Sequence, residues 1–253
     1  EREGFRVHRA LLERVLTPRT KLLVLNSPAN PTGAALTRKE LEGLAALAVE
    51  RGIWILSDET YEQLVYDGYR HLSIASMGSQ VYARTILANS LSKAYAMTGW
   101  RVGYAAGPTE IIAAMDGLQS QMTSNPTSIS QRAAVAALVG PQEPTHLMRE
   151  EFARRRRYVV DRLNGMPGIR CLNPEGAFYV FPNVSSLYGK RHAEKAVTNS
   201  SEFSAFLLEA ARIAVVPGVE FGSDAHIRIS YATSVGNIEK GMDRMAAALT
   251  QLT

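Results

Sequence analysis

One lysine stands in a setting that invites a chemical explanation. In NSLSKAYAMTGWRVGY, which begins at Asn89, Lys93 follows an apolar run and two serines, and Arg101 comes eight positions later. A solvated turn would explain this pattern. A lysine in a turn is usually just solvated, but a site where a lysine bonds covalently to a carbonyl carbon would also explain the pattern. Such an amine must be partly desolvated and held among polar groups before a Schiff base can form.

A carboxylate follows another apolar run. IWILSDETY places Asp58 at the end of an expected strand and Tyr61 three positions later. Such an aspartate is commonly a helix cap or loop anchor, but a buried carboxylate needs a cationic or hydrogen-bonding partner. A protonated pyridine nitrogen would be one, and pyridoxal 5'-phosphate (PLP) combines a lysine imine with an acid at that nitrogen. Its phosphate would need hydroxyls and an arginine, which Ser90, Ser92 and Arg101 supply.

Two further polar residues lie in distinctive surroundings. Asn30 belongs to NSPANPTG, which by itself predicts only a turn. Arg228 lies in HIRIS, an expected buried strand, where an arginine is rarely left unpaired. An internal ion pair with Asp224 or Glu220 is one interpretation of Arg228, and binding of a ligand carboxylate is the other.

The elements that must position these residues can be predicted from apolar runs. Runs without polar alternation indicate buried strands in TKLLVLNSP, IWILSDE, RTILANS and WRVGYAAG. Thr37 and Glu40 form a capping box that opens the helix RKELEGLAALAVER. This alternation predicts an α/β fold, a mostly parallel sheet covered by helices on both faces. Ligands of such sheets bind beyond the carboxyl ends of the strands, where Asn30, Asp58 and Lys93 fall.

The sequence changes character near residue 150. A long helix around residues 145–164 is expected to link two parts of the chain. After it, short strands are expected in GIRCLNP, GAFYVFPNV, IAVVPG and HIRISYA, with helices between them. We therefore predict a large domain over residues 1–150 and a smaller α+β domain over residues 151–253. The polar loop at 185–200 has no predicted role.

Composition excludes several classes of protein. Of the 253 residues, 46% are apolar and 21% are charged, as in an ordinary globular domain. The net charge of +4 is small and scattered, so we expect no nucleic-acid partner. The densest basic run, Arg154 to Arg157, is expected to be a solvated helix face paired with Glu150 and Glu151.

The single cysteine indicates which cellular compartment to expect and which metal sites are excluded. With only Cys171, the chain has no intrachain disulfide framework and no cysteine-rich metal site, so we expect a reducing, cytoplasmic location and no metal. Cys171 is expected to be a small core residue on a short strand. No apolar run approaches the ~20 residues that span a bilayer, so no membrane partner is expected.

Five motifs together resemble a known family. The chain resembles the fold-type I, class I/II PLP-dependent aminotransferases, most closely the bacterial- and archaeal-type aspartate aminotransferases, essentially from Glu1 to Thr253. The motifs are NSPANPTG, SDETYEQLVYDG, SLSKAYAMTGWRVGY, PEGAFYVFPN, and VVPGVEFG followed by HIRISYA. Family members carry an N-terminal arm, a first strand, a Gly-rich phosphate turn and a ring-stacking aromatic before the point where this chain begins. The N-terminal part of the family is therefore expected to be absent here.

The resemblance implies how a cofactor would be held. Lys93 would hold PLP as an imine and later move a proton. Asp58 would keep the pyridine nitrogen protonated, and Tyr61 would bond to the phenolic oxygen of the ring.

The resemblance also implies the groups that bind the phosphate and the substrate. Ser90, Ser92 and Arg101 would hold the phosphate. Asn30 would contact the phenolic oxygen and the substrate carboxylate, and Arg228 would bind that carboxylate with its planar guanidinium.

The implied activity is transfer of an amino group between an L-amino acid, aspartate or a similar one, and a 2-oxo acid such as 2-oxoglutarate, in a homodimer. A PLP-dependent β-lyase of the same fold is an alternative, which would release pyruvate and ammonia from a sulfur amino acid without a keto-acid acceptor. A second alternative is a non-catalytic, aminotransferase-like effector domain of a regulator, with a DNA-binding helix pair upstream. A fragment that keeps only the fold is a third.

Overall fold

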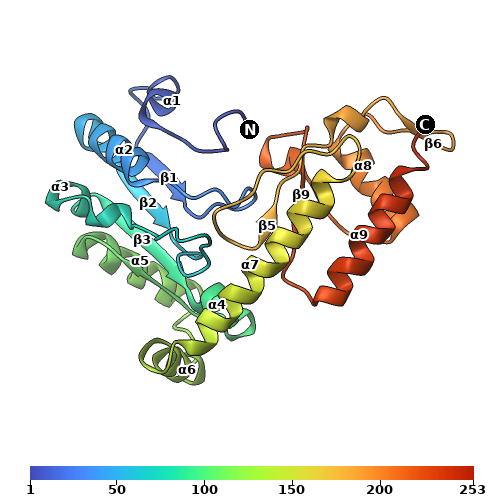
Figure 1. The fold of residues 1–253 in the computed structure, drawn as a ribbon. Helices are drawn as coiled ribbons and strands as arrows, with labels where there is room; N and C mark the ends of the chain where they lie inside the picture. Colours follow the sequence, from blue (N-terminus) through green and yellow to red (C-terminus); the bar gives the residue numbers. More distant parts are fainter. The chain divides into compact units, whose positions relative to one another are not determined.

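The computed structural model describes residues 1–253, which form two compact units. The first unit contains Glu1–Ala29 and Ala34–Arg149, and the second contains Asn30–Gly33 and Glu150–Thr253. The segment Asn30–Gly33, predicted to belong to the large domain over residues 1–150, packs within the second unit. Each unit is described separately below, with the elements labelled as in Figure 1.

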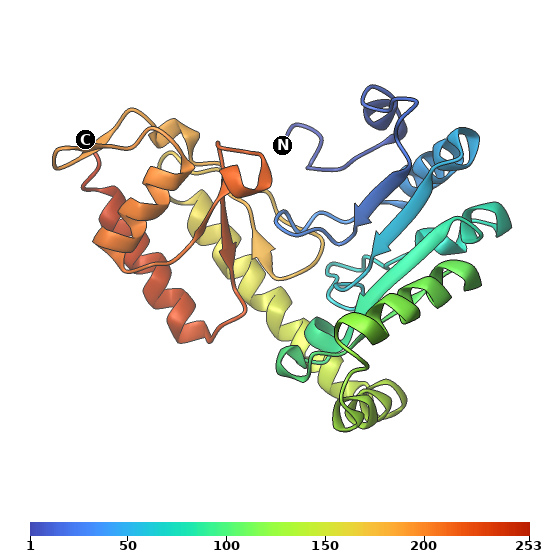
Figure 2. The same cartoon turned by 180° about the vertical axis from the view of Figure 1, so that it is seen from behind.

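The first unit is built on a four-stranded sheet in the order β1-β2-β3-β4. Its strands are β1 (Leu22–Asn26), β2 (Trp54–Asp58), β3 (Thr85–Ser90) and β4 (Gly103–Ala106). The first three are parallel and β4 runs antiparallel to β3, so the predicted α/β fold with a mostly parallel sheet is confirmed (Figures 1 and 2). The helices are α1 (Arg9–Glu13), α2 (Arg38–Arg51), α3 (Ser79–Tyr82), α4 (Leu91–Ala94), α5 (Thr109–Met122) and α6 (Ser128–Val139), with 3-10 turns η1 (Ile74–Ser76) and η2 (Thr98–Trp100).

Helix α2 shows how the sequence builds this unit. Its N-terminus carries the predicted capping box, in which Glu40 N donates to Thr37 Oγ1 and Thr37 N donates to the Glu40 carboxylate. Its apolar face is buried against the sheet, where Leu44 and Ile55 are fully buried in one core cluster. Burying two such side chains stabilises the unit by about 3–6 kcal/mol.

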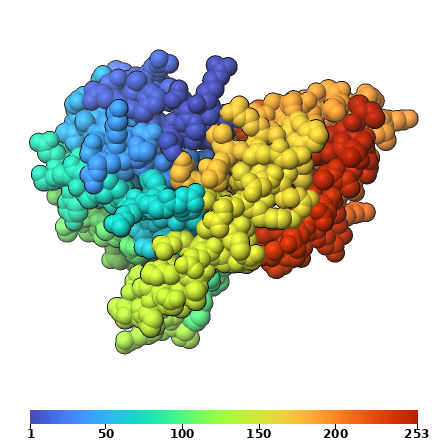
Figure 3. Space-filling view, in the orientation of Figure 1, coloured from blue at the N-terminus to red at the C-terminus, as the bar shows by residue number.

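Helices were predicted to cover both faces of the sheet, but one face of β1 is exposed. Side chains alternate across a strand, and Leu25 faces the core beneath α2. Val24 points the other way and is 61% exposed. Helix α6 likewise carries exposed apolar side chains, Ile129 and Val139 among them, and lies at the molecular surface in Figure 3.

The second unit is a smaller α+β assembly. Helix α7 (Glu143–Asn164) leads into it. A three-stranded antiparallel sheet has the order β5-β9-β8, and a separate hairpin pairs β6 with β7. The remaining elements are β5 (Tyr179–Val180), η3 (Ser185–Leu187), β6 (Arg191–His192), β7 (Lys195–Ala196), α8 (Ser200–Phe206), a π-helical turn (Leu207–Ala211), β8 (Val216–Pro217), η5 (Gly218–Phe221), β9 (Ile227–Ser230) and α9 (Val235–Leu249).

Two details of the second unit differ from the predicted short strands and polar loop. The expected strand in GIRCLNP is absent, and only an isolated bridge joins Arg170 to Asn183. Cys171 is nevertheless buried as predicted, and burial raises the pKa of its thiol to about 12. The polar loop 185–200 contains the β6–β7 hairpin.

The basic run on α7 is only partly a solvated face. Arg154 and Arg155 pair with Glu151 at 2.9 and 2.8 Å, as predicted. Arg156 is 1% exposed, and its Nη1 donates to the carbonyl oxygen of Pro174 at 2.6 Å. The prediction was wrong for Arg156 because a helix turns once every ~3.6 residues, so four consecutive side chains cannot all face water.

None of the helices combines the length and the apolar composition that crossing a bilayer requires.

Candidate active site

Asp58 is the last residue of β2. The parallel register pairs it with Asn26 on β1 and Ala88 on β3, so it lies at the carboxyl edge of the sheet. Its carboxylate is half-buried and accepts a hydrogen bond from Thr60 N at 3.1 Å. No side-chain cation of the chain is paired with it. A partly desolvated carboxylate without a protein counter-ion can bind a cationic ligand group.

A buried acid fixes the turn that follows. Glu59 is 2% exposed and accepts hydrogen bonds from Ser57 Oγ at 2.8 Å and Ser73 Oγ at 2.7 Å. Its other oxygen lies 2.9 Å from His71 Nε2. Burial acts to raise the pKa of Glu59, but hydrogen bonds from His71, Ser73 and Ser57 and the charge of His71 lower it overall. The network ties the turn after β2 to the segment before η1, and sequence analysis did not anticipate it.

Glu62 lies close to this network. One ligand atom each from Glu59, Glu62 and His71 lie within 4.8 Å of one another, a grouping that could hold a metal ion. The oxygens of Glu59 already accept from two serines and face His71, so hydrogen bonding accounts for the positions of Glu59 and His71. Tyr61, between the two acids, is 5% exposed.

The end of β3 carries the lysine. Ser90 ends β3 and caps α4, and its Oγ accepts from Ser92 N at 3.2 Å. Ser90 N donates to Asn89 Oδ1 at 2.7 Å. Lys93 lies in the single turn of α4 and is half-buried. The hydroxyls and the amine therefore follow β3 at the same edge as Asp58.

Arg101 approaches this edge from β4. Gly103, the first residue of β4, pairs with Ser90, the last residue of β3. Arg101 precedes Gly103 by two residues, so it lies just past the end of the sheet at which β3 ends. A Cβ at position 103 would come within 2.7 Å of the Asn89 carbonyl oxygen, which explains the glycine. Arg101 is left-handed, with a φ of 51°, and its Nη1 donates to Thr98 O at 2.8 Å. Its exposed guanidinium has no carboxylate partner and lines a cavity of about 390 Å³.

The remaining two predicted residues belong to the second unit and contact each other. Arg228 lies on β9, and its Nη1 donates to Asn30 Oδ1 at 2.8 Å. Of the two interpretations of Arg228, the internal ion pair with Asp224 or Glu220 is not formed. Asp224 instead accepts from Ser200, and no carboxylate is paired with Arg228.

Asn30 is held in the second unit by the glycine that follows it in the NPTG motif. Gly33 O accepts from Gly176 N at 2.8 Å. Gly33 has a φ of +68°, and a Cβ there would come within 2.5 Å of Pro174 Cβ. Only glycine fits this backbone approach without displacement, so the NPTG and PEGAFY motifs pack against each other.

Two aromatic rings beside Arg228 were missed. Arg228 Cζ lies 4.7 Å from the ring centroid of Tyr179 and 5.0 Å from that of Phe221. Both rings lie in motifs that the sequence analysis quoted, GAFYVFPN and GVEFG, but apolar composition there predicted only a core.

The structure therefore brings the predicted residues together in two sets. The first unit gathers one set at the carboxyl ends of β2 and β3: Asp58, Tyr61, Ser90, Ser92, Lys93 and Arg101. The second unit joins Asn30 and Arg228 directly.

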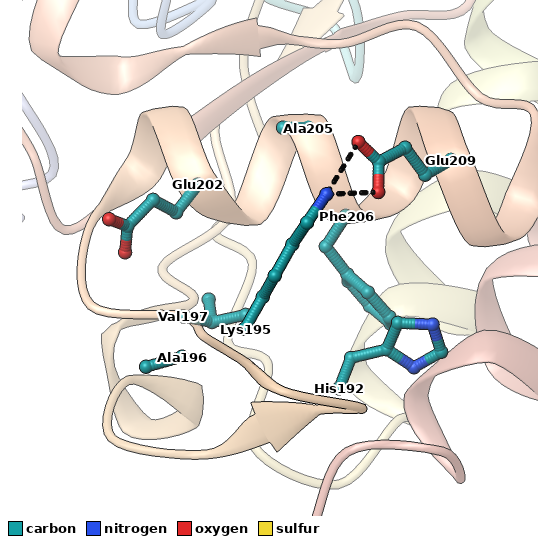
Figure 4. A pocket seen from close by; sticks show the side chains of 8 residues that line it. All are labelled: His192, Lys195, Ala196, Val197, Glu202, Ala205, Phe206 and Glu209. Carbon is teal, nitrogen blue, oxygen red and sulfur yellow. Dashed lines mark hydrogen bonds and ion pairs between the residues drawn. The ribbon is translucent and has the colours of Figure 1, made fainter.

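A separate pocket of about 350 Å³ lies between the β6–β7 hairpin and α8 (Figure 4). Lys195 Nζ spans it to both Glu209 carboxylate oxygens at 3.1 and 3.0 Å. The His192 ring lies 5.1 Å from that of Phe206. None of the predicted site residues lines this pocket.

Comparison with known proteins decides the family. The family profile described as aminotransferase class I and II matches residues 1–245. The chain belongs to the class I and II aminotransferase family. It is 45% identical over 245 residues to an aspartate aminotransferase of Geobacillus stearothermophilus, which covers 97% of this chain and 61% of that protein. It is 48% identical over 246 residues to an aspartate/prephenate aminotransferase of Cereibacter sphaeroides, covering 96% of this chain and 62% of that protein.

Solved structures agree with this family assignment. The crystal structure of the aspartate aminotransferase from Rhizobium meliloti superposes with a TM-score of 0.96 at 44% identity, covering all of this chain and 64% of that one. The Thermus thermophilus aspartate aminotransferase with maleate gives a TM-score of 0.87 at 40% identity, covering 98% of this chain and 62% of that one. The chain thus spans somewhat less than two thirds of the length of these aminotransferases.

Proposed function

We propose that the protein transfers an amino group between L-aspartate, or a similar amino acid, and a 2-oxo acid such as 2-oxoglutarate, using PLP. One observation carries this proposal. Asp58, Arg101 and Arg228 are each fixed by hydrogen bonds yet have no counter-ion within the chain. A pyridinium, a phosphate and a substrate carboxylate would complement these three charges.

The donor set of the first unit fits PLP. Asp58 would bind the ring nitrogen, and Tyr61 would bond to the phenolic oxygen. Ser90, Ser92 and Arg101 would bind the phosphate, since hydroxyls and a guanidinium are its usual partners. Bound PLP supplies an aldehyde for amine attachment and a ring that withdraws electrons from the substrate Cα.

Lys93 would be the attachment point and the proton carrier. A lysine amine can bond to a carbonyl carbon and, once displaced, can accept a proton from the substrate Cα. Its location in α4, directly after the serines that we assign to the phosphate, supports both roles. An arginine could not replace it, because a guanidinium does not deprotonate usefully.

Arg228 and Asn30 would orient the substrate. A guanidinium binds a carboxylate through two parallel N–H groups, which fixes direction as well as position. The bond from Arg228 to Asn30 restricts the guanidinium and uses one of its five N–H donors. The amide of Asn30 would also contact the substrate carboxylate and the phenolic oxygen of PLP.

The relatives favour this reaction over the alternatives. The curated proteins above are named aspartate or aspartate/prephenate aminotransferases, which supports transamination over β-elimination or effector binding. The Thermus structure holds maleate, a dicarboxylate, and this supports a dicarboxylic substrate here. We further propose that the enzyme acts in the cytoplasm as a homodimer, consistent with exposed apolar side chains such as Val24.

The test combines activity with covalent mapping. Oxaloacetate formed from aspartate and 2-oxoglutarate is followed by coupling to malate dehydrogenase. In parallel, the protein is incubated with PLP and reduced with borohydride, and the labelled peptide is identified. We expect the label on Lys93 and loss of both label and activity in Lys93→Arg, while Lys39→Arg on the exposed face of α2 changes neither. A label elsewhere, or an active Lys93→Arg protein, would refute the proposal.

A further inference from the structure

The arginine assigned to the substrate carboxylate is held by aromatic rings instead of an acid. Arg228 Cζ lies over Tyr179 at 4.7 Å and over Phe221 at 5.0 Å. A ring face attracts a guanidinium without consuming an N–H donor and without neutralising its charge. An aspartate or glutamate at the same place would do both.

Phe221 is itself fixed by a series of rings. It meets Phe181 edge to face, with centroids 6.0 Å apart and planes at 88°. Phe181 stacks on His226 at 4.8 Å with planes 9° apart. His226 is 4% exposed, and its Nδ1 lies 2.8 Å from Ser223 Oγ. The ring that touches Arg228 is therefore supported from the core of the second unit.

The backbone holds the segment of Phe221 against the strand of Arg228. Gly218 begins η5, the turn that ends at Phe221, and its N donates to His226 O at 2.8 Å. A Cβ at position 218 would lie 2.2 Å from the carbonyl oxygens of both Ser223 and His226, so only glycine allows this approach. His226 immediately precedes β9, on which Arg228 lies. The distance between Phe221 and Arg228 is thus set by paired backbone.

From this geometry we infer that Phe221 is a positioning residue for carboxylate binding by Arg228. Its ring restricts the guanidinium to one place, leaves the charge uncompensated and uses none of the N–H groups, so those not bonded to Asn30 stay available to a ligand. The inference rests on the proposed function, which makes Arg228 the carboxylate ligand. Tyr179 shares the contact, but it belongs to the buried sheet, so Phe221 is the cleaner residue to change.

The experiment measures the affinity of the protein for succinate by isothermal titration calorimetry. Succinate carries carboxylates but no amino group, so its binding reports the arginine without requiring turnover. Phe221→Leu removes the ring and keeps apolar volume, and we expect affinity to fall about 2- to 30-fold. Phe221→Tyr keeps the ring face and should keep the affinity. Arg228→Ala should abolish binding.

Phe206→Leu is the matched control. Phe206 is a buried ring of the same unit that packs against Phe203 and His192 and makes no contact with Arg228. The Phe206→Leu variant should have a lower melting temperature but an unchanged succinate affinity. The Phe221→Leu variant should bind succinate more weakly, even if its melting temperature falls no further than that of Phe206→Leu. PLP affinity should stay unchanged in both variants.

The outcomes separate the two proposals. Wild-type affinity in Phe221→Leu, or an equal loss in Phe206→Leu, would overturn the positioning role and leave the proposed function intact, provided that Arg228→Ala abolishes binding. If Arg228→Ala binds succinate normally, or if the wild-type protein does not bind it, then the carboxylate role of Arg228 fails and the positioning role fails with it.

Discussion

Glu59 offers the sharpest test of how the candidate site is supported. Its carboxylate is 2% exposed and faces three groups, Ser57 Oγ, Ser73 Oγ and His71 Nε2, at 2.7–2.9 Å. Glu59→Ala removes the acceptor of these three groups, of which Ser57 is buried and Ser73 and His71 are half-buried. We expect this to cost about 3–5 kcal/mol, because a hydrogen bond to a charged group contributes about 1.5–3 kcal/mol. Glu59→Gln keeps the shape and one acceptor oxygen, so we expect a smaller loss of about 1–3 kcal/mol.

Tryptophan fluorescence can measure this loss in the first unit. The chain has two tryptophans, and Trp54 lies on β2, the strand that precedes Glu59. In a Trp100→Phe background, urea unfolding followed by the emission of Trp54 reports the sheet that Glu59 supports. The free energy of unfolding, obtained by linear extrapolation, is compared between Glu59 and its variants. Glu62→Gln is the control, because Glu62 lies in the same turn and its carboxylate makes no hydrogen bond, while its backbone N donates to Glu59 O in both proteins. We expect it to change the free energy of unfolding by less than about 0.5 kcal/mol.

The pH dependence gives the sign of the effect. The pKa of Glu59 is lowered from its ordinary value of 4.5, since hydrogen bonds led by that of His71 outweigh burial. A lowered folded-state pKa means that the carboxylate stabilises the fold above pH 4.5 and that this stabilisation is lost as pH falls through the folded-state value. The difference between wild type and Glu59→Gln should therefore be full near neutral pH and should shrink below pH 4.5.

Two results would refute this reasoning. A loss under about 1 kcal/mol in the free energy of unfolding of Glu59→Ala would mean that these hydrogen bonds stabilise the fold little more than hydrogen bonds to water would. A wild-type advantage over Glu59→Gln that is constant between pH 7 and pH 3 would mean that the charge of Glu59 is not the stabilising feature.

Two further predictions test the supports of the site. Gly33→Ala should destabilise the protein by about 1–3 kcal/mol more than Gly52→Ala in thermal unfolding, because both have a positive φ but only position 33 is crowded; equal losses would contradict the packing of the two motifs. Asp58→Ala should lower turnover by several orders of magnitude while borohydride still fixes PLP to the protein, and near-normal turnover would count against pairing of Asp58 with the ring nitrogen.

The sequence alone predicts much of the first unit because its signals are local. Apolar runs without alternation mark β1, β2 and β3, and each run ends at the polar residue that ends the strand, as at Asp58. The capping box of Thr37 and Glu40 lies within a single turn of chain, so its spacing can be read directly. Where the interaction spans only a few residues, the pattern and the structure agree.

Interactions between distant segments could not be read in this way. Ser73 and His71 reach Glu59 from a loop 12–14 residues away, and nothing in the spacing indicates that contact. Arg156 is buried because its carbonyl partner, on Pro174, arrives from another segment. In both cases a charged residue is usually expected at the surface, and only tertiary hydrogen bonding explains its burial.

The charge of Arg228 stays unpaired because a nearby acid is hydrogen-bonded elsewhere. Asp224, four residues earlier, was one candidate counter-ion, but its Oδ1 accepts from Ser200 N at 2.9 Å and Ser200 Oγ at 2.7 Å. Ser200 begins α8, whose free N-terminal N–H groups favour a carboxylate. The side-chain hydrogen bond from Ser200 leads the interactions that lower the pKa of Asp224, so the carboxylate stays ionised at the helix. Because α8 engages this acid, the charge of Arg228 remains uncompensated within the chain, which is the condition that a carboxylate-binding arginine must meet.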